Sequence, residues 1–408
     1  MTYTTVGIDV SKATGAVAFS RQNEIIEQFK IDLNRQGFDY LKQRMSPYKQ
    51  VQVIFEATGV YSKRVEAYMR DNDIRYAVLS PVVGHKRISN YGDDEIFIKT
   101  DESDARALAA SARESDFENF YHESETQREL RDMNRFYEQL EDESVKARTR
   151  THRITEKVFS TFLDEFTVKG DSKFPWLILS AFPHPDLVLD ADVNEVMQTI
   201  NGLTNKNIGQ KQLLNYAKKL YKAASLAYSE VSKESDTVMQ VSYWAKRTAE
   251  IQDLQNAQIN KMHSIVRDYP EYKHFLSLPG VGQNTAVRLI AELGDLRRFS
   301  SVRKLNAYVG IGHGKRSSGM ITNPEKITHT GNAHARRLIF NVVANMRKAW
   351  RSGLGKPNHL MEYDKKRRSE NSKLASKINT VATMDRVLRT LFNLVKLNQD
   401  YIYEFTQK

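Results

Sequence analysis

The chain has 408 residues, of which 40% are hydrophobic, and a chain of this length commonly folds into two or three domains. It contains no cysteine, so disulfide bonds, a thiol nucleophile and cysteine-ligated zinc fingers are excluded. The formal net charge of +11 favours a polyanionic partner, with a solvated basic surface as the alternative.

The first residues, MTYTTVGIDVSK, lack the basic region followed by an apolar region that marks a signal peptide. No run of the sequence approaches the ~18 apolar residues that a membrane helix needs. These features, together with the lack of cysteine, predict a cytoplasmic protein that does not bind a membrane.

The first hundred residues predict an α/β domain. The stretches TTVGIDV, TGAVAFS and IIEQFKI are typical of three adjacent strands. A helix over Phe38–Tyr48 leads to the strand VQVIFEA, and a helix over Ser62–Asp71 leads to the strand YAVLS. Three strands followed by helix–strand–helix–strand is the order of a ribonuclease H-like domain.

Four acidic residues lie at the ends of predicted strands or in the helix that follows them. Asp9 ends the first strand, Glu56 ends the fourth, and Asp101 and Asp104 lie one turn apart in the next helix. Four carboxylates at one sheet edge repel each other unless cations lie between them, and two Mg²⁺ ions suit such oxygen ligands. The alternative is that Asp101 is an N-cap and that Asp104 interacts with the helix dipole.

The middle of the chain predicts long helices. Residues 122–166 carry an apolar seam with heptad spacing, and helical patterns return over Gln210–Tyr228 and Glu234–Arg267. Two long helices flanking an insertion indicate an antiparallel coiled-coil arm, and a plain helical core is the alternative. In the insertion, FPWLILSAFPHPDL contains three prolines, which are expected to break any helix.

The last third of the chain is basic. Between Arg297 and Lys377 there are 19 lysines and arginines against 4 acidic residues. The stretch LPGVGQNTA before this segment predicts a tight turn between two helices, similar to a helix-hairpin-helix module, although an ordinary helical corner is the alternative. Asymmetric charge of this kind predicts nucleic acid as the partner.

A glycine-rich loop in this segment, GIGHGKRSSGM, lacks the spacing of a phosphate-binding loop, G-x-x-x-x-G-K-[ST]. Its Ser317 and Ser318 are candidates for a nucleophile, and a simple Ser-Gly turn is the alternative. Cations that could stabilise charge at phosphorus, and could bind nucleic acid, lie in the loop and in the helix after it: Lys315, Arg316, Arg336 and Arg337.

Several of these motifs together resemble the DEDD transposases of the insertion sequence 110 family, which includes Piv-type invertases and bridge-RNA-guided recombinases. The resemblance lies in Asp9, Glu56, the block KTDESDARALA, and the stretches LPGVGQNTA, YVGIGHGKRSSGM and THTGNAHARRLI. The late helices around MEYDKKRRSENSKLASKINTVATMDRVLRTL are similar as well.

This resemblance implies three domains: a RuvC-like catalytic domain over residues 1–120, a helical arm with an insertion over 121–268, and a C-terminal transposase domain over 269–408. It implies that Asp9, Glu56, Asp101 and Asp104 bind Mg²⁺. It also implies that Ser318, with Ser317 as a close rival, attacks DNA to form a phosphoserine intermediate.

The implied partners are donor and target DNA, a guide RNA (bridge RNA) encoded by the element, and further copies of the chain in a dimer or tetramer. A prokaryotic protein associated with the nucleoid when active is also implied. Two other functions remain open: a RuvC-like Mg²⁺-dependent hydrolytic nuclease or junction resolvase, and a non-catalytic nucleic-acid-binding protein.

Overall fold

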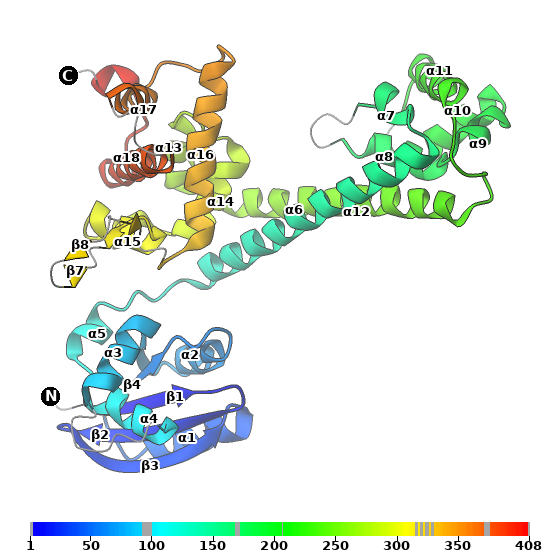
Figure 1. Cartoon of the computed structure of the whole chain (residues 1–408). Coiled ribbons are helices and arrows are strands. Elements are labelled where there is room, and N and C mark those ends of the chain that lie inside the picture. The colour runs from blue at the N-terminus through cyan, green and yellow to red at the C-terminus, as the bar shows by residue number, and fades with distance from the viewer. Residues whose placement is uncertain are drawn as a thin grey trace. The chain divides into compact units, whose positions relative to one another are not determined.

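The structure is a computed structural model that divides into two compact units, Met1–His122 and Glu123–Lys408 (Figure 1). Each unit has apolar core residues of its own. The described residues are 3–91, 100–167, 172–205, 207–314, 317–318, 321–322, 326–327, 330–370 and 376–406.

The first unit contains a mixed five-stranded sheet in the order β3-β2-β1-β4-β5. The first three strands form an antiparallel meander, whereas β4 and β5 run parallel to β1. The predicted α/β character of this region is thus confirmed. The strands are β1 (Thr4–Val10), β2 (Thr14–Arg21), β3 (Glu24–Asp32), β4 (Val51–Glu56) and β5 (Arg75–Leu79).

Helices pack on both faces of this sheet. Helices α1 (Arg35–Met45) and α2 (Ser62–Asp71) cover the face to which alternate residues of β1, such as Val6 and Ile8, contribute apolar side chains. Helices α3 (Pro81–Tyr91) and α4 (Asp101–Ala110) cover the other face, and the short α5 (Glu114–Glu118) follows. Helix α3, which begins at a proline, was not predicted from the sequence.

Gly7 on β1 lets α4 approach the sheet closely. A Cβ atom at this position would lie 2.3 Å from the carbonyl oxygen of Ala105 and 2.5 Å from the nitrogen of Ala109. Both contacts are with helix backbone, which cannot move aside like a flexible side chain. The small residue at this position therefore sets the distance between α4 and β1.

Gly7→Ala is expected to destabilise the first unit by about 1–3 kcal/mol, because the extra methyl group overpacks the contact between helix and sheet. Amide hydrogen exchange of β1 and α4 under native conditions measures this change. Gly202→Ala is the matched control, since a Cβ atom there meets nothing within 4 Å. Equal protection of β1 in the Gly7→Ala and wild-type proteins would contradict the close packing of α4.

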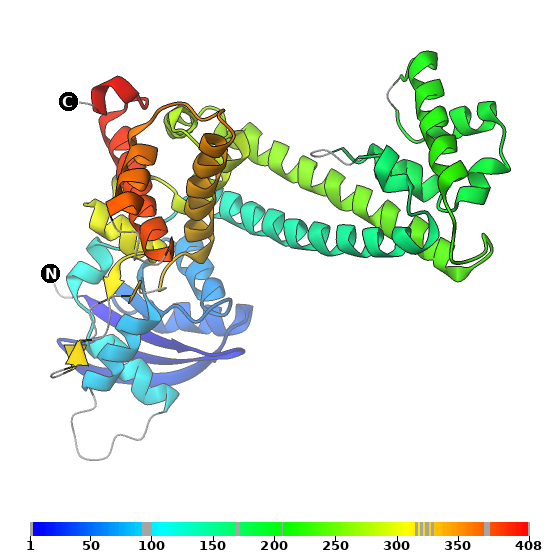
Figure 2. The same cartoon turned by 45° about the horizontal axis from the view of Figure 1, so that its top comes forward.

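Two long helices of the second unit, α6 (Glu125–Val158) and α12 (Asp236–Val266), pack antiparallel along each other (Figures 1 and 2). Buried apolar residues line the contact, and a buried pair of threonine hydroxyls, Thr151 and Thr248, lies in it with an oxygen–oxygen distance of 3.0 Å. The two helices are called the arm below. The long helix predicted over residues 122–166 ends at Val158.

Five shorter helices form a lobe at the end of the arm, with a core around the fully buried Trp176. The expectation that prolines would break any helix here is wrong. Pro175 lies in the first turn of α8 and Pro185 begins α9, where a missing N–H costs nothing. The helices are α7 (Phe162–Glu165), α8 (Phe174–Ala181), α9 (Pro185–Leu189), α10 (Val193–Gly202) and α11 (Gln210–Leu226).

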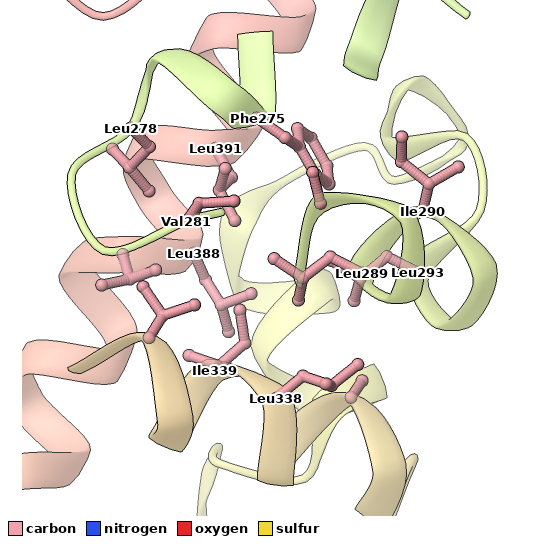
Figure 3. Close-up of a cluster of buried hydrophobic side chains, with 14 of the residues drawn as sticks. Phe275, Leu278, Val281, Leu289, Ile290, Leu293, Leu338, Ile339, Leu388 and Leu391 are labelled. Atoms are coloured by element: carbon pink, nitrogen blue, oxygen red, sulfur yellow. The ribbon is translucent and has the colours of Figure 1, made fainter. Parts of the chain in front are cut away.

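The rest of the second unit is a mainly helical C-terminal body with one large apolar core (Figure 3). Leu130 and Met133 of α6 join this core, so the base of the arm is anchored in it. The elements are α13 (Pro270–Ser277), α14 (Gln283–Leu293), η1 (Leu296–Arg298), α15 (Val302–Val309), β6 (His313–Gly314), β7 (Ser317–Ser318), β8 (Ile321–Thr322), β9 (Lys326–Ile327), α16 (Ala333–Arg351), α17 (His359–Glu370), α18 (Ser376–Leu397) and η2 (Tyr403–Thr406).

The stretch LPGVG forms the turn between α13 and α14, as its glycines suggested. Gly280 has a φ of +83°, and a Cβ atom there would lie 2.5 Å from Cγ of Met346 and 2.9 Å from the carbonyl oxygen of Val342. Close packing on α16 therefore requires glycine at this position. No atom lies within 4 Å of a Cβ atom built on Gly282.

Candidate active site

Two of the predicted catalytic residues lie on adjacent strands. In the parallel pairing of β1 with β4, Ile8 is opposite Phe55, so the next residues, Asp9 and Glu56, lie at the same level of the sheet. Both are half-buried. Adjacent parallel strands are about 4.8 Å apart, and residues at equal register lie on the same face. Asp9 and Glu56 therefore share one face at the carboxyl end of these strands.

The other two predicted acidic residues lie in the first turn of α4. Thr100 is the N-cap: its hydroxyl accepts from the Ser103 amide at 3.2 Å, and the Ser103 hydroxyl accepts from the Thr100 amide at 2.9 Å. The alternative that Asp101 is the N-cap is therefore wrong. Asp101 is exposed and Asp104 is buried, with 7% of its surface accessible.

The packing of α4 brings Asp104 over the same face of the sheet as Asp9. Ala105 and Ala109 contact Gly7, which is two residues from Asp9 and therefore on the same face of β1. On the neighbouring strand, a Cβ atom at Gly84 of α3 would lie 2.4 Å from Oε2 of Glu56. Glycine at this position thus leaves room for the Glu56 carboxylate beside α3.

The four acidic residues are predicted to bind metal ions together. Among the residues that the structure describes, no group of three aspartate, glutamate or histidine residues lies in an arrangement that could hold a metal ion. Asp9 and Glu56 lie on the face of the sheet that α4 covers, and carboxylate oxygens are the donors that Mg²⁺ prefers. The Mg²⁺ site formed by all four acidic residues stays a prediction.

Glu102 has a different environment from its acidic neighbours. Its carboxylate lies 2.7 Å from the Lys30 ammonium on β3. The hydrogen bond from Lys30, together with bonds from the first turn of α4, lowers the pKa of Glu102 to about 2. This residue holds the outer edge of α4 against β3, and it therefore provides a control for experiments on Asp101 and Asp104.

Ser317 and Ser318 form β7, which pairs antiparallel with β8: Ser317 lies opposite Thr322 and Ser318 opposite Ile321. The structure describes the backbone of both serines. Lys315 and Arg316 lie outside the described residues. The assignment of Ser318 as nucleophile therefore stays a prediction, as do the nucleic-acid contacts of these two cations.

The loop that carries the serines is pinned where it begins and ends. The Asn332 amide donates to the carbonyl oxygen of Tyr308 at 2.7 Å, and Nη1 of Arg336 donates to the carbonyl oxygen of Val309 at 2.9 Å. Gly331, at φ +141°, could not carry a side chain, because a Cβ atom would lie 2.5 Å from the Tyr308 carbonyl oxygen. Both ends of the loop thus meet at the end of α15.

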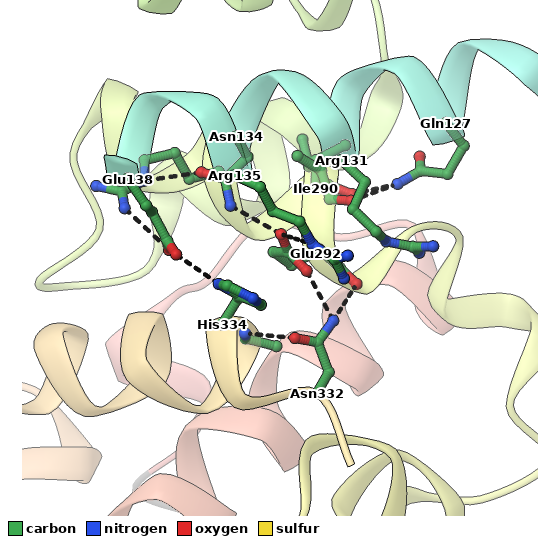
Figure 4. A network of polar contacts seen from close by, with 12 residues as sticks. Gln127, Arg131, Asn134, Arg135, Glu138, Ile290, Glu292, Asn332 and His334 are labelled. Carbon is green, nitrogen blue, oxygen red and sulfur yellow. Dashed lines mark hydrogen bonds and ion pairs between the residues drawn. The ribbon is translucent and has the colours of Figure 1, made fainter. Parts of the chain in front are cut away.

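A buried polar network packs against this junction (Figure 4). Glu292 on α14 has no accessible surface, and its carboxylate accepts from the side-chain amides of Asn134 at 2.9 Å and Asn332 at 2.8 Å. Asn134 in turn accepts from Nε of Arg288 at 2.9 Å. The network connects α6, α14 and the start of α16, so it fixes the residue at which the chain leaves the serine loop relative to the arm.

Glu292 and its partners were not predicted from the sequence. One signal was available, because Glu292 interrupts the apolar stretch VRLIAEL at a place where the helix is buried. An acidic residue on a buried helix face requires partners, but the sequence does not say which residues supply them.

The two predicted arginines of α16 have different surroundings. Arg336 is half-buried and bound to Val309, whereas Arg337 is exposed and lies 3.7 Å from Asp142. Arg336→Ala is expected to destabilise the C-terminal body by about 1–3 kcal/mol, because it removes a hydrogen bond from a charged donor. Thermal unfolding of the two single variants measures the difference, since Arg337→Ala removes only an exposed ion pair.

The same variants distinguish a role of each arginine in stability from a role in DNA binding. If Arg337 contacts a DNA phosphate, Arg337→Ala reduces the salt slope of duplex binding by about 0.9, and its unfolding is unchanged. Equal unfolding of the Arg336→Ala and Arg337→Ala proteins would contradict the structural role of Arg336.

The paired strand-end acids and the basic C-terminal body are typical of a protein that processes nucleic acid. Residues 6–160 match the DEDD transposases of IS110, described as "Transposase", and residues 272–355 match the "Transposase IS116/IS110/IS902 family". Together these matches span more than half of the chain. The chain belongs to the IS110 family of transposases, which confirms the resemblance found in its sequence.

A curated relative from Sinorhizobium fredii (strain NBRC 101917 / NGR234), named "Putative transposase y4qE", is 37% identical over 86 residues. The aligned segment covers 21% of this chain and 22% of that relative. Within the residues described, no helix is both long and apolar enough to cross a membrane.

Proposed function

We propose that this protein is a DNA recombinase that cuts and rejoins DNA strands with the four acidic residues and a serine nucleophile. The observation that carries the proposal is the placement of Asp9 and Glu56 side by side at the ends of β1 and β4. Carboxylates at the ends of two adjacent parallel strands place oxygen donors side by side, and such oxygens are the ligands that Mg²⁺ prefers. Membership of a transposase family supports DNA as the substrate.

The fold of the first unit supports a ribonuclease H-like, RuvC-like assignment. Three strands followed by helix–strand–helix–strand is the element order that the sequence predicted for such a domain, and these strands form a sheet in the order β3-β2-β1-β4-β5. We further propose three domains, with boundaries after residues 120 and 268.

Mg²⁺ would be held by Asp9, Glu56, Asp101 and Asp104, and it would supply Lewis-acid polarisation of a phosphate oxygen. The Ser318 hydroxyl attacks the phosphorus of a DNA phosphodiester, so a serine–phosphorus bond forms and the bond to the leaving 3′ oxygen breaks. The serine proton ends on that oxygen. The phosphoserine conserves the bond energy, so a 3′ hydroxyl of a second strand reverses the step and joins the strands without ATP.

The proposed partners are donor and target DNA, a bridge RNA that supplies target sequence by base pairing, and further copies of the chain in a dimer or tetramer. The basic segment between Arg297 and Lys377 supports contacts with phosphates. If the RNA recognises the target by base pairing, the protein itself needs to recognise little of the DNA sequence.

The experiment that tests this function uses the full chain expressed beside its native flanking DNA. With Mg²⁺ and DNA carrying the element ends, we expect strand cleavage accompanied by a protein–DNA adduct that survives denaturation. Gel electrophoresis with and without protease digestion detects that adduct, and sequencing of co-purified RNA identifies the guide. Cleavage that leaves only free 5′-phosphates would instead identify a hydrolytic nuclease.

A further inference from the structure

A cavity of about 420 Å³ lies between the two helices of the arm. It is far from the serine loop in the sequence and belongs to none of the motifs discussed above. The residues lining it come mainly from one face of each helix. They are Arg150, Arg153, Ile154 and Lys157 of α6, Thr237, Gln240 and Trp244 of α12, and Glu230 and Val231 from the segment before α12.

The α6 side of this cavity is strongly basic. Arg150, Arg153 and Lys157 are spaced three and four residues apart, so they share one helix face. All three are exposed, and none forms an ion pair with any residue that the structure describes. Other cations of the arm do form such pairs: Arg247 lies 3.5 Å from Glu143, and Lys261 lies 3.4 Å from Glu129.

An aromatic ring completes the basic surface. The Arg150 guanidinium lies 4.7 Å from the ring centroid of Trp244, which is half-buried. Cations that follow a backbone, combined with an aromatic platform, are the usual means of binding single-stranded nucleic acid. A cavity of about 420 Å³ has room for part of one strand.

One carboxylate lies among these cations. Glu230 is exposed and lines the same cavity. It would repel a bare phosphodiester strand, but a carboxylate can accept a hydrogen bond from a ribose 2′ hydroxyl, which DNA lacks. The neighbouring Gln240 and Thr237 also offer polar atoms to a ribose. This arrangement favours RNA over DNA.

We propose that this cavity of the arm binds a single-stranded segment of RNA, with Arg150, Arg153 and Lys157 on its phosphates and Glu230 accepting from a 2′ hydroxyl. The inference rests on the proposed function only in taking RNA as a partner. It gives the arm a binding role separate from the carboxylates and the serine.

The test compares two full-length double variants that each remove two positive charges. The cavity variant is Arg150→Gln with Arg153→Gln, and the control is Arg247→Gln with Lys261→Gln. Binding of an RNA about 20 nucleotides long and of DNA with the same sequence is measured at several salt concentrations. For the cavity variant, we expect RNA affinity to fall about tenfold and the salt slope to drop by about 1.4, because each phosphate that is no longer neutralised accounts for about 0.7 on a single strand. The control is expected to resemble the wild type.

A second variant tests the preference for RNA. Glu230→Gln is expected to leave DNA affinity unchanged or raised, and to reduce the ratio of RNA to DNA affinity about fivefold, because an amide oxygen accepts less strongly than a carboxylate. Equal RNA binding by the cavity variant and its control overturns the inference and leaves the proposed function standing. A ratio of RNA to DNA affinity that Glu230→Gln leaves unchanged overturns the RNA assignment. A wild-type protein that binds no RNA overturns both this inference and the guide-RNA part of the function.

Discussion

Ser318→Ala abolishes both DNA cleavage and the protein–DNA adduct if Ser318 is the nucleophile, because no neighbouring group replaces its hydroxyl in the attack on phosphorus. DNA binding is expected to survive, since one hydroxyl adds little beside the many cations of this segment. Mass spectrometry of a denatured, nuclease-trimmed reaction would locate the nucleotide remnant on the peptide containing both serines.

Ser317→Ala is the matched control, because it removes the same group one residue earlier in β7. We expect it to reduce the rate only modestly through a change in the hairpin. A remnant on Ser317 would move the assignment by one residue. Adduct-free cleavage by both single variants would show that water is the nucleophile.

Substitution of the four acidic residues is the second change that we expect to reduce DNA cleavage strongly. Asp9→Asn, Glu56→Gln, Asp101→Asn and Asp104→Asn are each expected to reduce cleavage by more than about a hundredfold, since even residues that only support a metal ligand contribute about 10- to 100-fold. Removing divalent ions with EDTA should have the same effect, and added Mg²⁺ should restore the wild type. Rates of single-strand cleavage on element-end DNA measure both.

Glu102→Gln is the control for these variants. It lies in the same helical turn as Asp101 and Asp104, but its carboxylate pairs with Lys30 on β3. It should retain cleavage, and hydrogen exchange of α4 should report any loss of packing. Full cleavage by the Asp101→Asn and Asp104→Asn proteins would leave these two residues a role only in the electrostatics of the first turn of α4.

Much of the first unit could be predicted from its sequence. The strands of this unit are short apolar runs bounded by turn residues, and helix α2 was expected over the residues where it lies. Helix α3 was missed because its sequence, PVVGHKRISNY, has no clear apolar stripe. Its position depends instead on packing, with Gly84 against Glu56 and Ile88 in the core beside α4.

The helices of the lobe at the end of the arm could not be predicted from the sequence for a different reason. Prolines were expected to break helices in FPWLILSAFPHPDL, although the same residue favours the first turn of a helix. Deciding between these effects requires knowing where a helix begins. In this lobe the burial of residues such as Trp176 and Val188 determines it, and sequence spacing alone does not show that burial.

The sequence by itself determined the family, the acidic residues at the ends of β1 and β4, and the concentration of basic residues after Arg297, because these depend on residue type and on local periodicity. Tertiary structure decided which groups meet. Thr100 and not Asp101 caps α4, Arg336 binds the end of α15, and Glu292 joins Asn134 to Asn332. The partners of Arg336 and Glu292 lie up to 158 residues away along the chain. Their side chains meet only after the helices have packed, since burial then requires each polar group to find a partner.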